Sequence, residues 1–376
     1  MSVLERYHES ERVELPQGVM FIKPGMRGYP ELPPAMRVFR NAFLGGGTLP
    51  LVDASGTAGA VALMAQAAFG AGENDQPVGL TVLEPSMAAL RCARRTFHKG
   101  AEVRAALPWD LAPGSISRLA LAPPADRGNA RVIAELQAAA EALREDGTLH
   151  VALHKDQGGK RYLKKLTELF GGTKVVARER GWRLIEARLP LASQHVDPWL
   201  GFEGAGMELV SLPGVHSAGR LDPGTTVLVS AAPWERLTQR RVLDLGCGVG
   251  VLALLAAGNG AKVTAVDDDL AAVASTRRNA ERRRLRVDVR HSDVDSTLGE
   301  EEFDFILTNP PFHVGRGVRL EVPAAFIAAA GRLLRPGGEL WLVANRDLPY
   351  EREFTCWASL EQVGDEGGFK VLRAVR

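Results

Sequence analysis

The sequence lacks the features that mark secreted and membrane proteins. Its three cysteines, Cys92, Cys247 and Cys356, are far apart and show no paired spacing of the kind that zinc sites or disulfide frameworks use. No apolar run approaches the roughly 18 residues that a membrane-spanning helix needs, and the charged stretch 1–16 contains no signal-peptide core. We therefore expect a cytoplasmic protein in a reducing environment, with no membrane association.

A large net charge is also missing. With 46 Lys and Arg against 45 Asp and Glu the formal net charge is +1, so any contact with nucleic acid must come from local clusters of basic residues. What the chain does have is 45% hydrophobic and 24% charged residues over 376 positions, a composition typical of folded proteins. This length exceeds a typical domain of about 100 to 200 residues, so we expect two domains.

Short apolar runs alternate with segments of helical period, which predicts parallel sheets covered by helices. The predicted strands are residues 49–52, 80–83, 119–121 and 148–153, then 241–245, 262–266, 287–290, 303–307 and 339–343. The predicted helices are residues 58–69, 87–97, 129–143, 270–281 and 323–334. The Pro- and Gly-rich stretch 190–224 has no sustained period, so we predict a connection there between two tandem α/β domains, residues 1–190 and 191–376.

The two predicted domains look like copies of one another. Residues 53–59 align with residues 244–250, and residues 144–149 align with 335–340 at the same offset. If a short gap is allowed between these anchors, residues 121–124 align with 308–311. An internal duplication explains this pattern most simply, and on this alignment Ala122 stands in the first copy where the second has Asn309.

A glycine-rich turn follows the predicted strand 241–245. Its glycines, Gly246, Gly248 and Gly250, let the backbone approach a ligand at the carboxyl edge of the sheet. A dinucleotide fingerprint needs a small residue where this chain has Val251, so the spacing disfavours NAD. It favours S-adenosylmethionine, whose ammonium group Asp244 could hold directly or through water. The alternative is a tight turn that binds no ligand.

Acidic residues end the next two predicted strands. Asp267 lies about 20 residues after the glycine turn, where a carboxylate can bind ribose hydroxyls, and Asp268 adjoins it in the predicted cofactor site. With Asp269 these residues could suggest a metal cluster, but no recognisable loop spacing supports one, so we expect no metal and assign Asp269 to capping the following helix. Asp293, with Val294 beside it, is placed to accept a hydrogen bond from the adenine amine.

The segment Asn309-Pro-Pro-Phe-His313 follows the apolar strand 303–307. A planar amine has a delocalised lone pair and must be oriented for in-line attack on a methyl group. The side-chain oxygen of Asn309 and the carbonyl of Pro310 can each accept one amino hydrogen, Pro311 stiffens the turn, and Phe312 can stack on a flat substrate. We predict Asn309, Pro310 and Phe312 as catalytic residues, with Pro311 and His313 also in the substrate site. The alternatives are a proline-rich turn with a core Phe, and a structural role for His313.

These motifs resemble those of the bacterial ribosomal RNA guanine-N2 methyltransferases that carry two tandem methyltransferase domains, above all the small-subunit RsmC type. The likeness covers most of the chain, and its most specific parts are Leu212-Pro-Gly-Val-His-Ser217, Leu221-Asp-Pro-Gly-Thr225, residues 244–250, residues 309–313, residues 337–345 and residues 368–374. It implies two Rossmann-like class I methyltransferase domains, of which the first is degenerate. It further implies methylation of a guanine amine in 16S ribosomal RNA, free or in an assembly intermediate. We expect the protein to be a monomer.

The resemblance also implies residue roles. Asp244, Gly246 and Gly250 would line the methionine part of the cofactor, Asp267 the ribose and Asp293 the adenine, while Asn309 with Pro310 would bind the target amine. The segment 221–225 resembles a stretch that packs over the cofactor. The sequence departs from the family at His216, where such proteins often have Phe, and at Asp293, where some have Asn.

The first domain is expected to bind RNA or to support the fold rather than to catalyse. Its turn carries Ser55 and Thr57 in place of glycines. The densest basic region of the chain lies in this domain and could bind RNA phosphates, and it comprises Lys155, Lys160, Arg161, Lys164, Lys165, Arg178, Arg180 and Arg183. A solvated helix face is the alternative interpretation.

Three rival functions remain open from the sequence. The Asn-Pro-Pro-aromatic segment also serves enzymes that methylate protein glutamine or DNA adenine, and a large-subunit guanine is a further possible target. A nicotinamide oxidoreductase on the same sheet, or an RNA-binding protein without activity, would be the other two classes.

Overall fold

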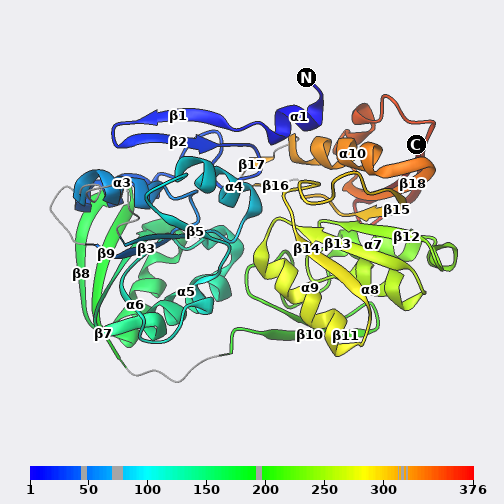
Figure 1. The fold of residues 1–376 in the computed structure, drawn as a ribbon. Helices are drawn as coiled ribbons and strands as arrows, with labels where there is room; N and C mark the ends of the chain where they lie inside the picture. Colours follow the sequence, from blue (N-terminus) through cyan, green and yellow to red (C-terminus); the bar gives the residue numbers. More distant parts are fainter. Residues whose placement is uncertain (44–48, 70–78, 192–196, 312, 315–316, 319–320) are drawn as a thin grey trace. The chain divides into compact units, whose positions relative to one another are not determined.

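The structure is a computed structural model that describes residues 1–43, 49–69, 79–191, 197–311, 313–314, 317–318 and 321–376 (Figure 1). The chain forms two compact units: the first unit is Ser10–Pro198, and the second unit combines Met1–Glu9 with Trp199–Arg376. This division differs from the sequence-based one at 190/191. The first nine residues join the second unit because Tyr7 is buried in its core, with 5% of its surface exposed.

The second unit is built on a seven-stranded sheet in which the chain order reverses at one point. The order across the sheet is β14 (Val287–His291), β13 (Lys262–Asp267), β12 (Arg241–Leu245), β15 (Phe303–Thr308), β18 (Leu334–Asn345), β20 (Phe369–Val375) and β19 (Ser359–Glu366). The first five are parallel, and β20 and β19 are added antiparallel. Because the chain runs outward from β12 to β14 and returns as β15, a crevice is expected at the carboxyl ends of β12 and β15.

Helices cover both faces of this sheet, so its parallel strands are apolar on both sides. One core cluster joins the strands to α7 (Pro223–Ala231), α8 (Val251–Gly258) and α9 (Leu270–Arg282), and the other joins them to α1 (Val3–His8) and α10 (Glu321–Leu333). Within β12, Val242 points to the first cluster while Leu243 and Leu245 point to the second. The alternation places Asp244 on the same face as Val242, one residue before the strand ends at Leu245 and the glycine turn begins.

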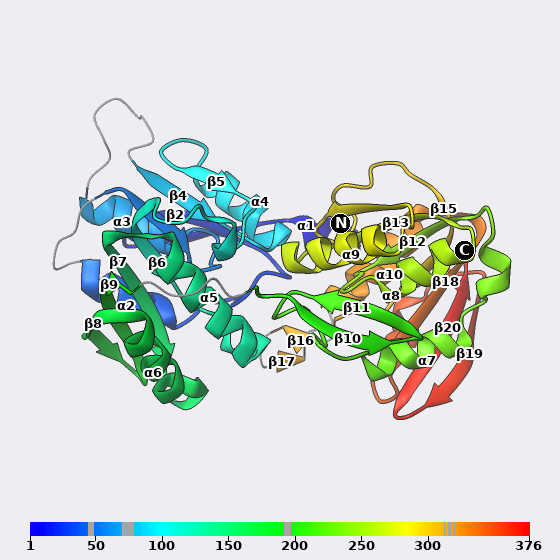
Figure 2. The same ribbon diagram turned by 90° about the horizontal axis from the view of Figure 1, so that it is seen from below.

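The first unit repeats this architecture strand for strand (Figure 2). Its sheet order is β5 (Glu102–Arg104), β4 (Leu80–Leu83), β3 (Leu51–Ala54), β6 (Ile116–Leu121), β7 (Leu143–His154), β9 (Trp182–Pro190) and β8 (Phe170–Glu179). The helices α2 (Ala35–Phe43), α3 (Ala60–Phe69) and α4 (Met87–Thr96) share one core cluster, and α5 (Asn129–Ala142) and α6 (Lys160–Leu169) share the other. The predicted fold class, two tandem α/β domains of the same architecture, is confirmed.

A two-stranded hairpin precedes the sheet in each unit: β1 (Glu11–Leu15) with β2 (Gly18–Ile22), and β10 (Leu200–Gly204) with β11 (Met207–Ser211). The second hairpin lies in the stretch 190–224, which the sequence led us to expect as an irregular connection. Isolated hairpins are marginal, and this one is held by α9. The Asn279 side chain bonds the NH and the carbonyl of Val210 at 2.8 Å each, a contact that spans 69 residues of sequence.

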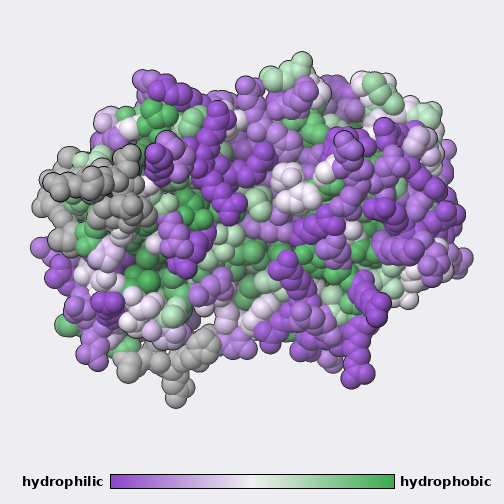
Figure 3. Space-filling view, viewed as in Figure 1, coloured by the Kyte–Doolittle hydropathy of each residue, from purple (hydrophilic) through white to green (hydrophobic). Residues whose placement is uncertain are grey.

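Hydrophilic side chains cover much of the molecular face seen in Figure 3, and large exposed hydrophobic side chains among the described residues are few: Met1, Val176, Leu189, Leu191 and Val363. Within the described parts of the chain, no helix has the length and apolar character needed to cross a lipid bilayer.

Candidate active site

The glycine turn after β12 requires glycine at each of its three positions. Gly246, Gly248 and Gly250 have φ angles of +82°, +57° and +90°, which other residues adopt only with strain. A Cβ at Gly250 would lie 2.8 Å from Thr276 Cγ2, and one at Gly246 would lie 3.0 Å from Phe326 Cε1. At Gly248 nothing lies within 4 Å of that position. The turn is therefore packed on two sides and open at Gly248, as a backbone cradle for a ligand would be.

Two carboxylates flank this cradle. Asp244 is 1% exposed; its Oδ2 accepts a bond from the Ala253 NH at 2.9 Å, and its Oδ1 is buried without a hydrogen-bond partner among the described residues. Asp267 keeps some exposure and accepts bonds from the NH groups of Gly248 and Asp269, both at 2.9 Å. Burial raises the pKa of each carboxyl to about 7, and for Asp244 the neighbouring charge of Asp267 adds to the shift. A cationic ligand would satisfy both.

The two residues after Asp267 have different surroundings. Asp269 caps α9 by accepting a bond from the Ala271 NH at 2.9 Å, so the capping interpretation is confirmed. The backbone carbonyl of Asp268 lies 2.7 Å from His291 Nε2. Among the residues that the structure describes, no group of three or more His, Cys, Asp or Glu side chains is arranged to hold a metal ion.

Asn309 follows β15 at the carboxyl edge, beside the strand that carries Asp244. Its Nδ2 donates to Asp222 Oδ2 at 2.7 Å and to Thr225 Oγ1 at 3.0 Å. An ionised carboxylate can only accept, so it fixes which end of the amide faces it. The oxygen of Asn309 therefore faces away from Asp222 and is left as an acceptor.

The role of Asp222 was not predicted from the sequence, in which the segment 221–225 stood out only through its resemblance. This residue caps α7, with its Oδ2 accepting from the Thr225 NH at 2.8 Å, and its Oδ1 lies 2.9 Å from His216 Nε2. Burial alone would raise the pKa of Asp222, but His216, the Thr225 NH and Asn309 together lower it to about 2. Asp222 therefore stays ionised and holds Asn309 in one orientation. Its position directly before Pro223, the first residue of α7, is the sequence signal that could have identified the cap.

The rest of the predicted acceptor segment is described only in part. Pro310 is buried and Pro311 is exposed. Phe312 lies outside the described residues. The backbone of His313 forms the short strand β16 (His313–Val314), which pairs with β17 (Gly317–Val318).

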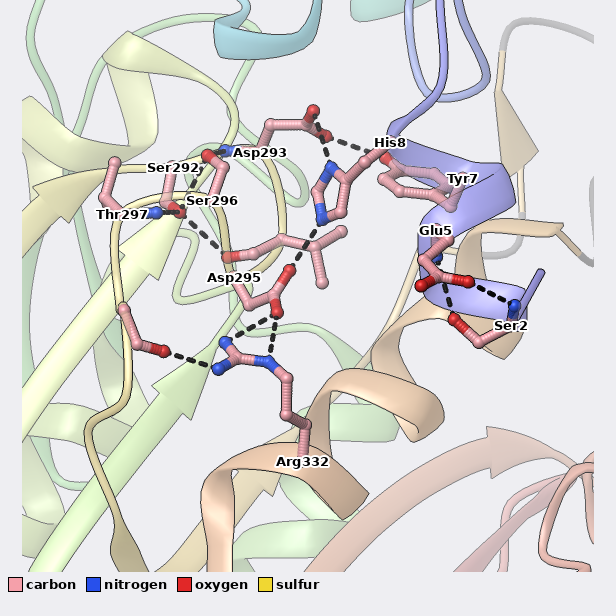
Figure 4. Close-up of polar contacts among 12 residues, drawn as sticks. Ser2, Glu5, Tyr7, His8, Ser292, Asp293, Asp295, Ser296, Thr297 and Arg332 are labelled. Atoms are coloured by element: carbon pink, nitrogen blue, oxygen red, sulfur yellow. Dashed lines mark hydrogen bonds and ion pairs between the residues drawn. The ribbon is translucent and has the colours of Figure 1, made fainter.

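Asp293 carries contacts that the sequence did not suggest (Figure 4). It is fully buried; the Tyr7 hydroxyl donates to its Oδ1 at 3.0 Å, and His8 Nδ1 lies 3.6 Å from its Oδ2. His8 Nε2 lies 2.7 Å from Asp295 Oδ1, and Arg332 on α10 donates to the other oxygen of Asp295 at 2.8 Å. Tyr7 and Asp293 are 286 positions apart in the sequence, which is why no local pattern could connect them.

This arrangement makes the stability of the second unit depend on pH. Burial alone would lower the pKa of His8, but Asp293 and Asp295 raise it above its usual value near 6.5. The stabilisation from charged His8 is therefore complete below about pH 6.5 and is lost as the pH rises through the raised pKa. We expect His8→Gln to cost about 1 kcal/mol in the free energy of unfolding at pH 6 and less at pH 9. Urea unfolding would check this, and an equal loss at both pH values would contradict it.

The first unit preserves the backbone of this site but fills it with its own side chains. Asp53, aligned with Asp244, has both oxygens bonded, to the NH groups of Ser55 at 2.9 Å and Ala62 at 2.8 Å. Ser55 and Thr57 bond each other at 2.7 Å inside the turn. Arg27 donates to the carbonyl of Ala122 at 2.7 Å, at the position aligned with Asn309. Among the described atoms, no acceptor equivalent to the Asn309 amide oxygen is present there.

Comparison with known proteins agrees with this geometry. Residues 206–373 match the family described as the methyltransferase small domain. The chain is 37% identical over 245 residues to the ribosomal RNA small subunit methyltransferase C of Chromohalobacter salexigens, which covers 64% of this chain and 73% of that protein. The corresponding protein of Alcanivorax borkumensis is 37% identical over 217 residues, 57% of this chain and 66% of its own length.

A solved structure is similar over the whole chain. It is the T. thermophilus 16S rRNA N2 G1207 methyltransferase RsmC in complex with AdoMet and guanosine, which is 37% identical, covers 100% of both chains and has a TM-score of 0.87. With a full-length structural match and the sequence likeness above, this chain belongs to the RsmC family of ribosomal RNA small subunit methyltransferases.

Proposed function

We propose that this protein transfers a methyl group from S-adenosylmethionine to the exocyclic N2 of a guanine in 16S ribosomal RNA. The observation that carries the proposal is the orientation of Asn309, whose amide nitrogen is held by Asp222 and Thr225 so that its oxygen is left as an acceptor next to the glycine cradle. The related T. thermophilus enzyme is described as modifying guanine 1207, and we propose the equivalent guanine here. This reaction would take place in the cytoplasm, where the RNA is made.

The donor site would be formed by the second unit alone. Asp244 and the backbone of Gly246, Gly248 and Gly250 would bind the methionine part, Asp267 and Asp268 the ribose side, and Asp293 with Val294 the adenine. Support comes from the unpartnered oxygen of Asp244 and the open space at Gly248. When bound, S-adenosylmethionine supplies an electrophilic methyl group on a sulfonium. The first unit, whose equivalent carboxylate Asp53 is fully bonded, would not bind the donor.

The acceptor residues would orient the amine rather than remove its proton first. The oxygen of Asn309 and the carbonyl of Pro310 would each accept one hydrogen of the guanine NH2, which aims the nitrogen at the methyl group and polarises it. Phe312 would stack on the base, and Pro311 and His313 would complete the pocket. As the nitrogen–carbon bond forms, the carbon–sulfur bond breaks, and the methylated nitrogen then loses one proton to solvent.

The pKa values near 7 predict how donor binding depends on pH. A cationic donor favours the ionised forms of Asp244 and Asp267, so its binding should release protons below about pH 7. We expect the Kd of S-adenosylmethionine to fall about tenfold between pH 6 and pH 8 for each proton released. Isothermal titration checks this, and S-adenosylhomocysteine, which keeps the ammonium group that Asp244 would hold, should show the same dependence on pH. A Kd that is flat over this range would contradict the electrostatic account.

The proposed function is tested by mapping methylated nucleotides in ribosomal RNA from cells with and without this gene. We expect loss of one N2-methylguanosine in 16S ribosomal RNA, restored by the wild-type chain. Loss of a methyl group from large-subunit RNA, from DNA adenine or from a protein glutamine, with 16S RNA unchanged, would instead support one of the rival substrates.

A further inference from the structure

The tip of the β8–β9 hairpin in the first unit gathers basic side chains, and we call this set, Lys155, Arg178, Arg180 and Arg183, the basic hairpin tip. Arg178 and Arg183 are direct partners in the antiparallel register. The NH of Lys155, at the end of β7, donates to the carbonyl of Gly181 in the turn at 3.0 Å. Like charges directly opposite each other destabilise a sheet, so the Arg178–Arg183 pair is expected to lower the stability of the first unit.

Acidic neighbours do not neutralise the tip. Within the described parts of the chain, none of its four cations forms an ion pair, and all except the half-buried Arg183 are exposed. Of the two nearest acids in sequence, Glu179 is bonded by Asn41 at 3.3 Å and lies 3.7 Å from Arg37. Asp156 lies 4.0 Å from His154. The tip therefore presents unpaired positive charge.

The second copy provides an internal comparison, because its backbone is the same at this place. The NH of Arg346 donates to the carbonyl of Gly368 at 2.9 Å, as that of Lys155 does to Gly181. The register partners equivalent to Arg178 and Arg183 are Asp365 and Lys370. There the charges are compensated: Arg346 pairs with Asp365, and Lys370 lies 2.6 Å from Glu351. The fold thus does not need a cation at the position of Arg178, where the second copy has Asp365.

We propose that the basic hairpin tip binds the phosphate backbone of the RNA substrate, a proposal that rests on the proposed function above. Guanidinium groups match phosphate oxygens as two-pronged donors, and a bound phosphate would relieve the repulsion between Arg178 and Arg183. We assign the contact to the hairpin tip rather than to the basic residues of α6, because the tip sets two cations directly opposite each other in the register, an arrangement that a phosphate would stabilise.

Arg178→Asp in the full chain tests this, because it recreates the Asp–cation pair of the second copy. We expect an unfolding midpoint equal to or slightly above that of wild type, an unchanged kcat at saturating RNA, and a KM for 16S ribosomal RNA raised about 5- to 10-fold. The slope of log KM against log salt concentration should fall by about 1. Arg144→Asp is the matched control, since Arg144 is exposed near the opposite end of β7 and the charge change is identical.

Several outcomes would overturn the proposal. An unchanged KM in Arg178→Asp would do so, as would an equal rise in Arg144→Asp, which would indicate net charge rather than a site. A KM that rises only with assembled subunits, and not with naked RNA, would point to an acidic protein partner instead. Failure of the wild-type chain to methylate 16S RNA would count against the proposed function itself. Methylation by the wild-type chain with an unchanged KM in Arg178→Asp would count against the hairpin contact alone.

Discussion

Asn309→Ala is expected to lower kcat for RNA methylation by about 10²- to 10³-fold, the usual cost of removing one oriented polar group from an active site. The side chain contacts the target amine in the proposed function, and its only described partners, Asp222 and Thr225, bind its other end. The affinity for S-adenosylmethionine should stay within about twofold, because the cradle is formed by β12 and β13. Single-turnover transfer and donor titration measure the two quantities separately.

The matched control for this variant is Asn259→Ala. Asn259 is an exposed residue of the same unit whose side chain donates to the carbonyl of Leu255 near the end of α8. Its replacement should leave transfer unchanged. Transfer by Asn309→Ala at the wild-type rate, with the protein folded and the donor bound, would rule out the role assigned to Asn309.

Asp267→Ala is expected to raise the Kd of S-adenosylmethionine by about 10- to 100-fold. The carboxylate would lose its proposed bonds to the ribose, and hydrogen bonds to charged groups are worth about 1.5 to 3 kcal/mol each. The substitution would also remove the hydrogen bond that the Gly248 NH donates to Asp267 at 2.9 Å, so the glycine turn would be less well ordered. Isothermal titration measures this effect.

Asp347→Ala is the control for Asp267→Ala, since Asp347 is an exposed aspartate of the same unit outside the proposed site. Its donor affinity should equal that of wild type. If folded Asp267→Ala bound the donor as tightly as this control, Asp267 could not be a ribose ligand.

Much of the fold could be predicted from the sequence because the parallel strands are buried on both faces and read as short apolar runs. β4 and β12 have the predicted bounds, and the glycine turn has the backbone that its spacing implied. The antiparallel edge strand β19 was not predicted, because its residues Ser359–Glu366 are mostly polar and exposed and resemble a loop.

The parts of the site that the sequence did not reveal depend on contacts between distant residues. Asp222 and Asn309 are 87 positions apart, and only the folded sheet brings them together. Tyr7 and His8 lie in the stretch that we assigned to the first domain, yet they bond Asp293 and Asp295 in the loop after β14 of the second unit. Local patterns identify strand ends and turns, whereas the partner that orients a side chain is set by tertiary packing.

The duplication explains how one copy could lose activity without losing its fold. Arg27 donates to the carbonyl of Ala122, the residue that aligns with Asn309 of the second copy. The Ser55 NH bonds one oxygen of Asp53, whereas the equivalent oxygen of Asp244 has no partner among the described residues. Each change replaces an expected ligand contact by an internal bond. The sheet, its strand order and both core clusters are retained. We infer that the first copy is free to serve RNA binding.

The most direct test is a crystal structure of this protein with S-adenosylhomocysteine and guanosine. Our account places the Asn309 amide oxygen about 2.7 to 3.2 Å from the guanine N2, with the amide nitrogen still on Asp222. A guanine that presents its N1 or a ring edge to this turn, or an amide oxygen hidden by packing, would contradict the proposed geometry of methyl transfer.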